Sequence, residues 1–320
     1  MNERKVPFGL REGVLHYVSE VDTGLACNCT CPDPACAKPL IARNLPSPTR
    51  KRAPYFAHAS QTPGCGGRES ALHRMGKEIV ECATQLRLPG WSALDGELSF
   101  STVPATLAPG SAQEVVLREG QMRPDVKVIA LTGQALLQAL YVEIKVSHAV
   151  DWSKRERVMA QGLNMMEIDL ADVSDEDLQD KATFAHHVLE RADNRHWIHI
   201  ASAPFLSRML GHSVIRVVNQ ECREKRVPTQ KGNQLVLREQ AMWRHEPAED
   251  DPKPFFGELA SYMKGDQRVD CFGNHLPYRK GLYVVAYVPG RGSYYDDTRF
   301  KTQLRPIVQD VPWNAQKPLL

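Results

Sequence analysis

The sequence has no apolar run long enough to cross a membrane. A membrane-spanning helix needs about 20 apolar residues in succession, and no run in this 320-residue chain approaches that length. No apolar signal-peptide stretch follows the opening residues, so we expect a cytoplasmic protein without a membrane partner. The chain also lacks a glycine-rich phosphate loop and a His-Glu-x-x-His motif, which leaves ATP use and zinc proteolysis unsupported.

A strong overall charge is absent too. The net charge of +2 argues neither for nor against a nucleic-acid partner. The segment from residue 38 to residue 77 is nevertheless basic, with one acidic residue against eight lysines and arginines. A surface of this kind can hold phosphates, although a solvated loop face has the same composition. The candidate nucleic-acid contacts in this segment are Arg50, Lys51, Arg52 and Lys77.

Cysteine is sparse over most of the chain and clusters near its start. Clustering in a chain without an export signal indicates metal ligation before disulfides. A structural zinc needs four ligands, and the predicted set is Cys31, Cys36, His58 and Cys65. Cys27 or Cys29 can replace one of these or stay free. Residues 27–66 are rich in Cys, Pro and Gly and bury little apolar surface, so a metal would supply missing stability.

Hydrophobic periodicity divides the rest of the chain. Helical spacing predicts a helix over residues 68–87, and capping patterns start further helices at Ser153 and Ser174, ending at Gly162 and near Arg191. Strands are predicted over residues 96–102, 123–131, 139–147 and 164–170. The order helix, three strands, helix, strand describes a mixed α/β (α+β) core.

We therefore expect three regions. A zinc-binding module spans residues 1–66, the α/β core spans residues 67–200, and a C-terminal region of unknown role spans residues 201–320. In the last region, strands are predicted over residues 214–219 and 282–288, and residues 246–254 are predicted to form an acidic exposed loop. A second zinc site is disfavoured by the long separations between its four candidates, Cys222, His245, Cys271 and His275.

Two neighbouring segments of the core carry the acidic and basic residues that suggest chemistry. In the segment Tyr141–Ser147 (YVEIKVS), the alternation of a strand places Glu143 and Lys145 on one polar face. Asp125 lies in the preceding strand segment, Arg123–Val126 (RPDV), on the opposite parity from its apolar neighbours. If the two strands pair as a hairpin, Asp125 comes beside Glu143.

Two carboxylates at such a distance repel each other and favour a divalent cation. Mg²⁺ or Mn²⁺ suits oxygen ligands, keeps bound waters and can activate one of them against a phosphodiester. We predict that Asp125 and Glu143 hold this metal and that Lys145 assists catalysis, by orienting the attacking water or stabilising the developing charge. The alternative is an exposed strand face with an ordinary Glu–Lys ion pair.

The predicted helix over residues 68–87 adds two supporting catalytic candidates. Glu69, His73 and Lys77 are spaced four residues apart and share one helix face. Glu69 and His73 can therefore flank the metal, or His73 can contact the phosphate. The alternative is a solvent face held by Glu–His and His–Lys contacts.

Together these residues resemble the competence protein CoiA-like family. The resemblance covers about residues 27–200 and rests on six pieces: the cysteine knuckle, Tyr55–His58 (YFAH), Glu69–Lys77, the two carboxylate segments, and Lys154 through Leu170. It implies an N-terminal zinc-binding segment, a PD-(D/E)XK nuclease-like core and a DNA-related role. Many relatives have His where this chain has Tyr55 and Gln where it has Lys145, and Lys is the usual residue in active nucleases of the wider fold.

The expected function is that of a Mg²⁺- or Mn²⁺-dependent DNA endonuclease, in competence-type DNA processing or in defence against foreign DNA. One alternative is a non-catalytic DNA- or RNA-binding protein that keeps the nuclease fold. Another is a protein that recruits a partner through its C-terminal region. The sequence does not separate single-stranded, duplex and branched DNA as the partner.

Overall fold

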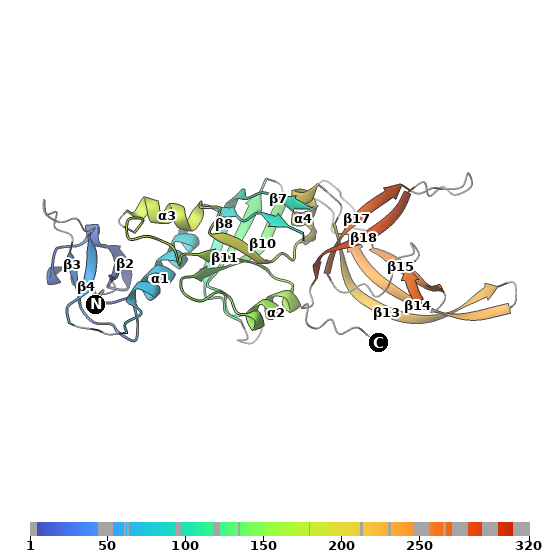
Figure 1. Ribbon diagram of the computed structural model, residues 1–320, viewed down its shortest axis with the longest axis horizontal. Helices are drawn as coiled ribbons and strands as arrows, with labels where there is room; N and C mark the ends of the chain where they lie inside the picture. Colours follow the sequence, from blue (N-terminus) through green and yellow to red (C-terminus); the bar gives the residue numbers. More distant parts are fainter. Residues whose placement is uncertain are drawn as a thin grey trace.

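The computed structural model describes residues 5–43, 54–60, 62, 64–93, 98–117, 122–133, 135–178, 180–211, 214–229, 232–245, 256–264, 267–270, 281–289 and 300–309. Within these ranges the fold is mixed α+β, with four α-helices and a curled six-stranded sheet near the middle of the chain (Figure 1). None of the helices in this part of the chain has the length and apolar character that a membrane crossing requires.

The N-terminal region consists of two short hairpins. β1 (Phe8–Arg11) pairs with β2 (Val14–Tyr17), and β3 (Leu40–Arg43) pairs with β4 (Tyr55–His58). Phe8 contacts Phe184 of the core with ring centroids 5.4 Å apart. Phe8 and Phe56 also belong to the same continuous apolar cluster as the core helices. The region is therefore packed directly on the core.

The central sheet has the strand order β12-β11-β10-β9-β8-β5. Its strands are β5 (Gln85–Leu88), β8 (Val103–Gln113), β9 (Val126–Thr132), β10 (Ala135–Lys145), β11 (Asn164–Asp169) and β12 (Arg195–His199). β10 and β11 are parallel and the other neighbours are antiparallel. The crossover between the two parallel strands contains α2 (Trp152–Gln161). Because β9 and β10 are antiparallel, the start of β9 and the end of β10, which carry the predicted carboxylates, lie next to each other.

The two faces of the sheet are covered by different helices. Ile144 of β10 shares its apolar cluster with α1 (Gly67–Cys82), α3 (Lys181–Leu189) and α4 (Ala203–Leu210). Tyr141, on the opposite parity of β10, packs instead with Val158 of α2. Figure 1 shows α2 on the other side of the sheet from α3 and α4.

A close approach of α1 to β10 depends on one glycine. A Cβ at Gly76 would lie 3.1 Å from Ile144 Cγ2 and 3.2 Å from Leu170 Cδ1. A side chain at this position would require Ile144 and Leu170 to shift by a few tenths of an ångström in a closely packed core. Gly76 therefore lets α1 hold its polar face close to the end of β10.

The first predicted helix is five residues too long. α1 ends at Cys82, and residues 85–88 form β5, in which Leu86 and Leu88 are buried on alternate positions. The prediction was wrong because Leu86 also fits the helical period of the preceding apolar residues, and pairing with β8 decides in favour of a strand. As a result four strands of the main sheet, not three, lie between α1 and α2.

The strand predicted over residues 96–102 is also corrected. Of its described residues, 98–102, only Ser99–Phe100 forms a strand, β7, which pairs with β6 (Trp91–Ser92) outside the main sheet. The predictions over residues 123–131, 139–147 and 164–170 correspond to β9, β10 and β11 with shifted ends. Of the predicted connection Thr132-Gly133, Gly133 lies between β9 and β10, whereas Thr132 is the last residue of β9 and pairs with Ala135.

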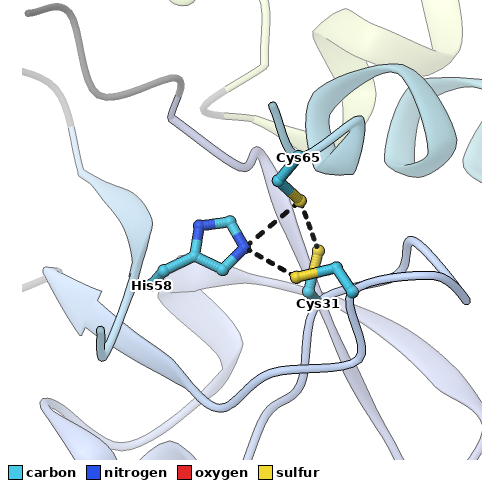
Figure 2. A group of neighbouring side chains, drawn as sticks. Cys31, His58 and Cys65 are labelled. Atoms are coloured by element: carbon cyan, nitrogen blue, oxygen red, sulfur yellow. Dashed lines mark hydrogen bonds between the residues drawn. The ribbon is translucent and has the colours of Figure 1, made fainter. Parts of the chain in front are cut away.

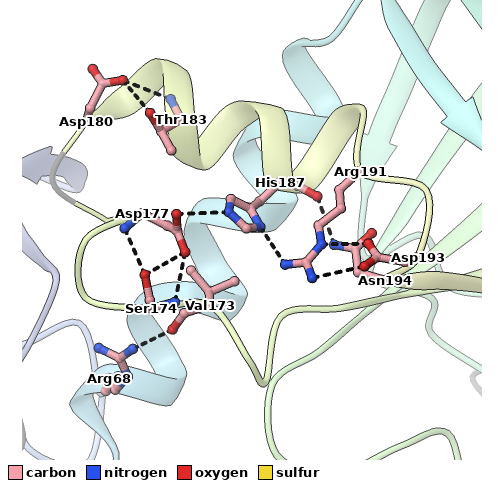
Figure 3. Close-up of polar contacts among 10 residues, drawn as sticks. All are labelled: Arg68, Val173, Ser174, Asp177, Asp180, Thr183, His187, Arg191, Asp193 and Asn194. Atoms are coloured by element: carbon pink, nitrogen blue, oxygen red, sulfur yellow. Dashed lines mark hydrogen bonds and ion pairs between the residues drawn. The ribbon is translucent and has the colours of Figure 1, made fainter.

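The helix predicted from Ser174 starts later. Ser174 and Asp177 do exchange capping hydrogen bonds, Ser174 N to Asp177 Oδ2 at 3.1 Å and Asp177 N to Ser174 Oγ at 3.2 Å. They stabilise a turn only, and Asp177 is held by an ion pair with His187 at 3.2 Å (Figure 3). α3 begins at Lys181 with Asp180 as its N-cap. Similarly, the N-cap of α2 is Asp151, two residues before the predicted Ser153.

One buried arginine ties α3 to the sheet. Arg195 of β12 is 6% exposed and donates to four backbone carbonyl oxygens. Three of them, on His187, Val188 and Leu189, lie in the last turn of α3, and the fourth is on Arg87. Burial lowers the pKa of Arg195 to about 10, so it stays charged at neutral pH.

Replacing Arg195 by Met should therefore destabilise the protein by about 2–4 kcal/mol, because several buried carbonyls lose their donors. The free energy of unfolding, measured by urea titration, tests this. The matched control is Arg157→Met on the exposed face of α2, which should change stability by no more than about 0.5 kcal/mol. Equal stability of the two variants would contradict the prediction.

The C-terminal region contains a second six-stranded sheet with the order β16-β15-β14-β13-β17-β18. Its strands are β13 (Val214–Thr229), β14 (Gly232–His245), β15 (Phe256–Lys264), β16 (Gln267–Asp270), β17 (Gly281–Pro289) and β18 (Phe300–Gln309). The predicted strands over residues 214–219 and 282–288 lie within β13 and β17. Val214 and Leu282 are buried in the same apolar cluster as Phe205 of α4. The acidic segment 246–254 lies outside the described residues.

Candidate functional site

A cleft of about 260 Å³ opens beside the carboxyl end of β10. It is bounded by α1, by β10 and by the connection from β10 to the start of α2. Its lining is mostly polar and comprises Glu69, His73, Asp125, Glu143, Ile144, Lys145, Val146, Ser147, His148, Ala149, Val150, Asp151, Lys154 and Glu167. All five predicted catalytic residues thus line one cleft, although they come from three separate segments of the chain.

Asp125 lies just before β9 and is held by two donors. Its Oδ2 accepts a hydrogen bond from the backbone N–H of Ile144 at 2.8 Å and lies 3.1 Å from Nε2 of His73. Burial raises the pKa of Asp125, but the hydrogen bond and charge of His73 and the Ile144 amide outweigh it and leave the pKa below its ordinary value. Asp125 is therefore ionised and fixed in the cleft.

Glu143 is almost completely buried and only half satisfied. The residue is 7% exposed, and its Oε2 accepts from Lys154 Nζ at 2.5 Å. Among the described residues, its Oε1 is buried without a hydrogen-bond partner. Burial and the negative charge of Asp125 raise the pKa of Glu143 to about 7, against the opposing effects of Lys154 and the Asp125 backbone amide. The described part of the fold thus holds a carboxylate in the cleft with one oxygen that makes no hydrogen bond.

The raised pKa of Glu143 gives a stability prediction with a definite sign. Below pH 4.5 the carboxyl is protonated in both the folded and the unfolded state, so folding is not penalised. Between pH 4.5 and about 7 the unfolded state ionises first, and stability falls as pH rises. The total loss is on the order of 3 kcal/mol and is complete above pH 7.

Glu143→Gln removes this penalty. Without divalent cations, the variant should be more stable than wild type at pH 8 and lose that advantage near pH 4. Thermal unfolding across this pH range measures the difference, with exposed Glu176→Gln as a control that shows no such crossover. A pH-independent difference between Glu143→Gln and wild type would contradict the expected titration.

The ion-pair partners of the two cleft lysines were not predicted from the sequence. Lys145 Nζ forms an ion pair with Asp169 Oδ2 of β11 at 2.5 Å, which raises the pKa of Lys145. The cation on Glu143 is instead Lys154, from the first turn of α2. Sequence reasoning missed Lys154 because its place beside Glu143 depends on how the crossover helix returns over the sheet. Its signal was a lysine three residues after the helix cap Asp151.

Glu69 and His73 share one face of α1, as predicted, and both line the cleft. The side chain of Glu69 is 52% exposed and accepts a hydrogen bond from the Ser147 hydroxyl. His148 Nδ1 lies 3.8 Å from the same carboxylate. His73 orients Asp125, so its main described contact is with a predicted metal ligand.

The described residues do not form the predicted nucleic-acid contact surface. The Lys77 side chain is 9% exposed, and its Nζ lies 2.6 Å from Glu114 Oε1. This ammonium is therefore engaged within the fold and not displayed to a phosphate. Arg50, Lys51 and Arg52 lie outside the described residues.

A second cluster brings together the four residues predicted to bind zinc. The ligand atoms of Cys31, Cys36, His58 and Cys65 lie within 4.8 Å of one another. Cys31 Sγ is 3.6 Å from Cys65 Sγ, and His58 Nε2 is 3.5 Å from Cys65 Sγ (Figure 2). His58 Nε2 is also 3.5 Å from Cys36 Sγ. In tetrahedral zinc coordination, two sulfurs are about 3.8 Å apart and sulfur and nitrogen about 3.5 Å. The cluster is thus compatible with a structural zinc site.

The alternative ligands Cys27 and Cys29 are occupied elsewhere. Both thiols are buried, and they donate to the carbonyl oxygens of Leu40 and Cys27, each at 3.3 Å. Their roles are those of small apolar side chains in the core of the module. Burial raises the pKa of the Cys31 thiol, so a metal is the means by which it would become a thiolate.

No protein-family model, curated protein or solved structure matches this chain. The resemblance to the CoiA-like family therefore stays a prediction from its motifs. The geometry of the two clusters is the basis for functional inference.

Proposed function

We propose that this protein is a Mg²⁺- or Mn²⁺-dependent endonuclease of the PD-(D/E)XK type that hydrolyses phosphodiester bonds in DNA. The observation that carries the proposal is the meeting of Asp125 and Glu143 in one cleft, where Glu143 presents a buried oxygen without a donor. An oxygen of this kind is costly to bury unless a cation binds it.

The chain's own residues can perform the supporting roles. Asp125 and Glu143 would hold the metal, and His73 and the Ile144 amide keep Asp125 ionised and oriented. When bound, the metal supplies an activated water and polarises the phosphodiester. Lys145 and Lys154 both line the cleft, so their ammonium groups can offset charge that builds on the phosphate.

The order of elements supports the same proposal. The sequence α1, β8, β9, β10, α2, β11 is helix, three strands, helix, strand, with β5 as an additional edge strand. Asp125 precedes β9 and Glu143 and Lys145 lie on β10, which are the places that the motif assigns to its acidic and basic residues. We further propose that Cys31, Cys36, His58 and Cys65 bind one structural zinc.

The decisive experiment is cleavage of single-stranded, duplex and branched DNA by the full chain with Mg²⁺, Mn²⁺ or Ca²⁺. Cleavage with Mg²⁺ or Mn²⁺ but not with Ca²⁺ is expected, because Ca²⁺ takes a looser and larger coordination shell. Tight DNA binding without cleavage by any of the metals would replace the proposal with the non-catalytic binding protein.

A further inference from the structure

Three cross-strand pairs of β10 and β11 face α2. The parallel register places Tyr141 beside Met165, Glu143 beside Glu167, and Lys145 beside Asp169. Tyr141 and Met165 form an apolar contact under α2, and Lys145 and Asp169 form an ion pair. The middle pair consists of two acids, and like charges directly opposite each other destabilise a sheet.

Glu167 is more deeply buried than Glu143. It is 1% exposed, and its Oε2 accepts from the backbone N–H of Val150 at 2.8 Å. Among the described residues, its Oε1 is buried without a hydrogen-bond partner. His196 Nε2 lies 3.6 Å from that oxygen, beyond hydrogen-bond distance, and is instead 3.3 Å from the Arg155 guanidinium.

Two buried acids on neighbouring strands therefore each carry one oxygen without a donor. Both acids line the cleft, and Lys154 is bound to only one of their four oxygens. Two adjacent carboxylates with free oxygens form a ligand pair for a hard divalent cation, which prefers oxygen donors and tolerates bound water. Glu143 and Glu167 are directly opposite each other in the parallel register, so both side chains point to the same face of the sheet.

We propose that Glu167 is a ligand of the divalent cation in the cleft and shares it with Glu143. This inference rests on the proposed function, because it assumes that Glu143 binds a metal. It adds a ligand from β11, a strand that supplies neither Asp125 nor Glu143. A metal ligand at Glu167 then explains why an acid is buried between the apolar residues Met166 and Ile168.

The experiment measures Mn²⁺ binding to the full chain by electron paramagnetic resonance of free Mn²⁺. Glu167→Gln should weaken Mn²⁺ binding at least about tenfold and abolish most of the rise in melting temperature that Mn²⁺ causes in wild type. Gln keeps an oxygen for the Val150 amide, so the metal-free variant should show wild-type circular dichroism. The control is Glu176→Gln, which is exposed and lies outside the cleft.

Unchanged Mn²⁺ affinity in a folded Glu167→Gln variant would overturn this proposal. If wild type binds Mn²⁺ and cleaves DNA while Glu167→Gln behaves like Glu176→Gln, only the role of Glu167 fails. If wild type binds no Mn²⁺ at millimolar concentration, the proposed function fails together with it.

Discussion

Asp125→Asn is expected to lower the rate of metal-dependent DNA cleavage about a thousandfold or more while the protein stays folded. The change removes one negative charge from the cleft but keeps an oxygen that can accept from Ile144 N–H and His73. Loss of a charged metal ligand removes both the activation of water and the polarisation of the phosphate. The effect should therefore appear in the chemical step.

Single-turnover cleavage at saturating enzyme measures this step, with Mn²⁺ affinity measured in parallel. Asp172→Asn is a matched control, because Asp172 is exposed and does not line the cleft. The control should cleave at the wild-type rate. Wild-type cleavage by a folded Asp125→Asn protein would place the active site elsewhere or identify the activity as a contaminant.

Removal of the zinc is expected to have the largest effect on stability. Wild type should contain one zinc per chain, and Cys65→Ser should lose it and unfold residues 27–66. Structural zinc sites contribute on the order of 10 kcal/mol in small modules. Zinc content by mass spectrometry of metals and limited proteolysis measure both effects. Cys82→Ser is the control, since Cys82 is exposed and outside the cluster.

Loss of the zinc should also disturb the cleft, because the Cys/His cluster adjoins the start of α1. Cys65 accepts a hydrogen bond from Gly67 N–H, and Asp33 accepts one from Gly66 N–H. These contacts hold the end of the helix that carries Glu69 and His73. Slower cleavage is therefore expected along with zinc loss. A Cys65→Ser protein that keeps its zinc, or a zinc-free wild type that resists proteolysis, would contradict the assignment.

Several local features were predictable because they depend on short-range geometry. Gly162 ends α2 in the left-handed conformation, as its position after the helical pattern predicted. The period of a strand placed Glu143 and Lys145 on one face, and both line the cleft. The Cys and His spacing identified all four members of the Cys/His cluster, Cys31 through Cys65.

The boundaries of elements were less predictable because apolar residues fit more than one period. Leu86 matched the helical period in sequence, and pairing with β8 makes it part of a strand. The capping pattern at Ser174 forms as predicted, but Asp177 is also bound to His187, and the helix starts after Asp180. Tertiary contacts thus decided where these helices begin and end.

The sequence by itself determined that Glu143 and Lys145 share one strand face, that Glu69 and His73 share one helix face, and that the clustered Cys and His residues are candidate zinc ligands, since strand and helix periods and ligand spacing are local properties. Only the tertiary structure decided their partners. The parallel register of β10 and β11 pairs Lys145 with Asp169 and sets Glu167 beside Glu143, and the return of α2 brings Lys154 to Glu143. These pairings join residues from different elements, and no local pattern specifies the register between strands or the path of a crossover helix.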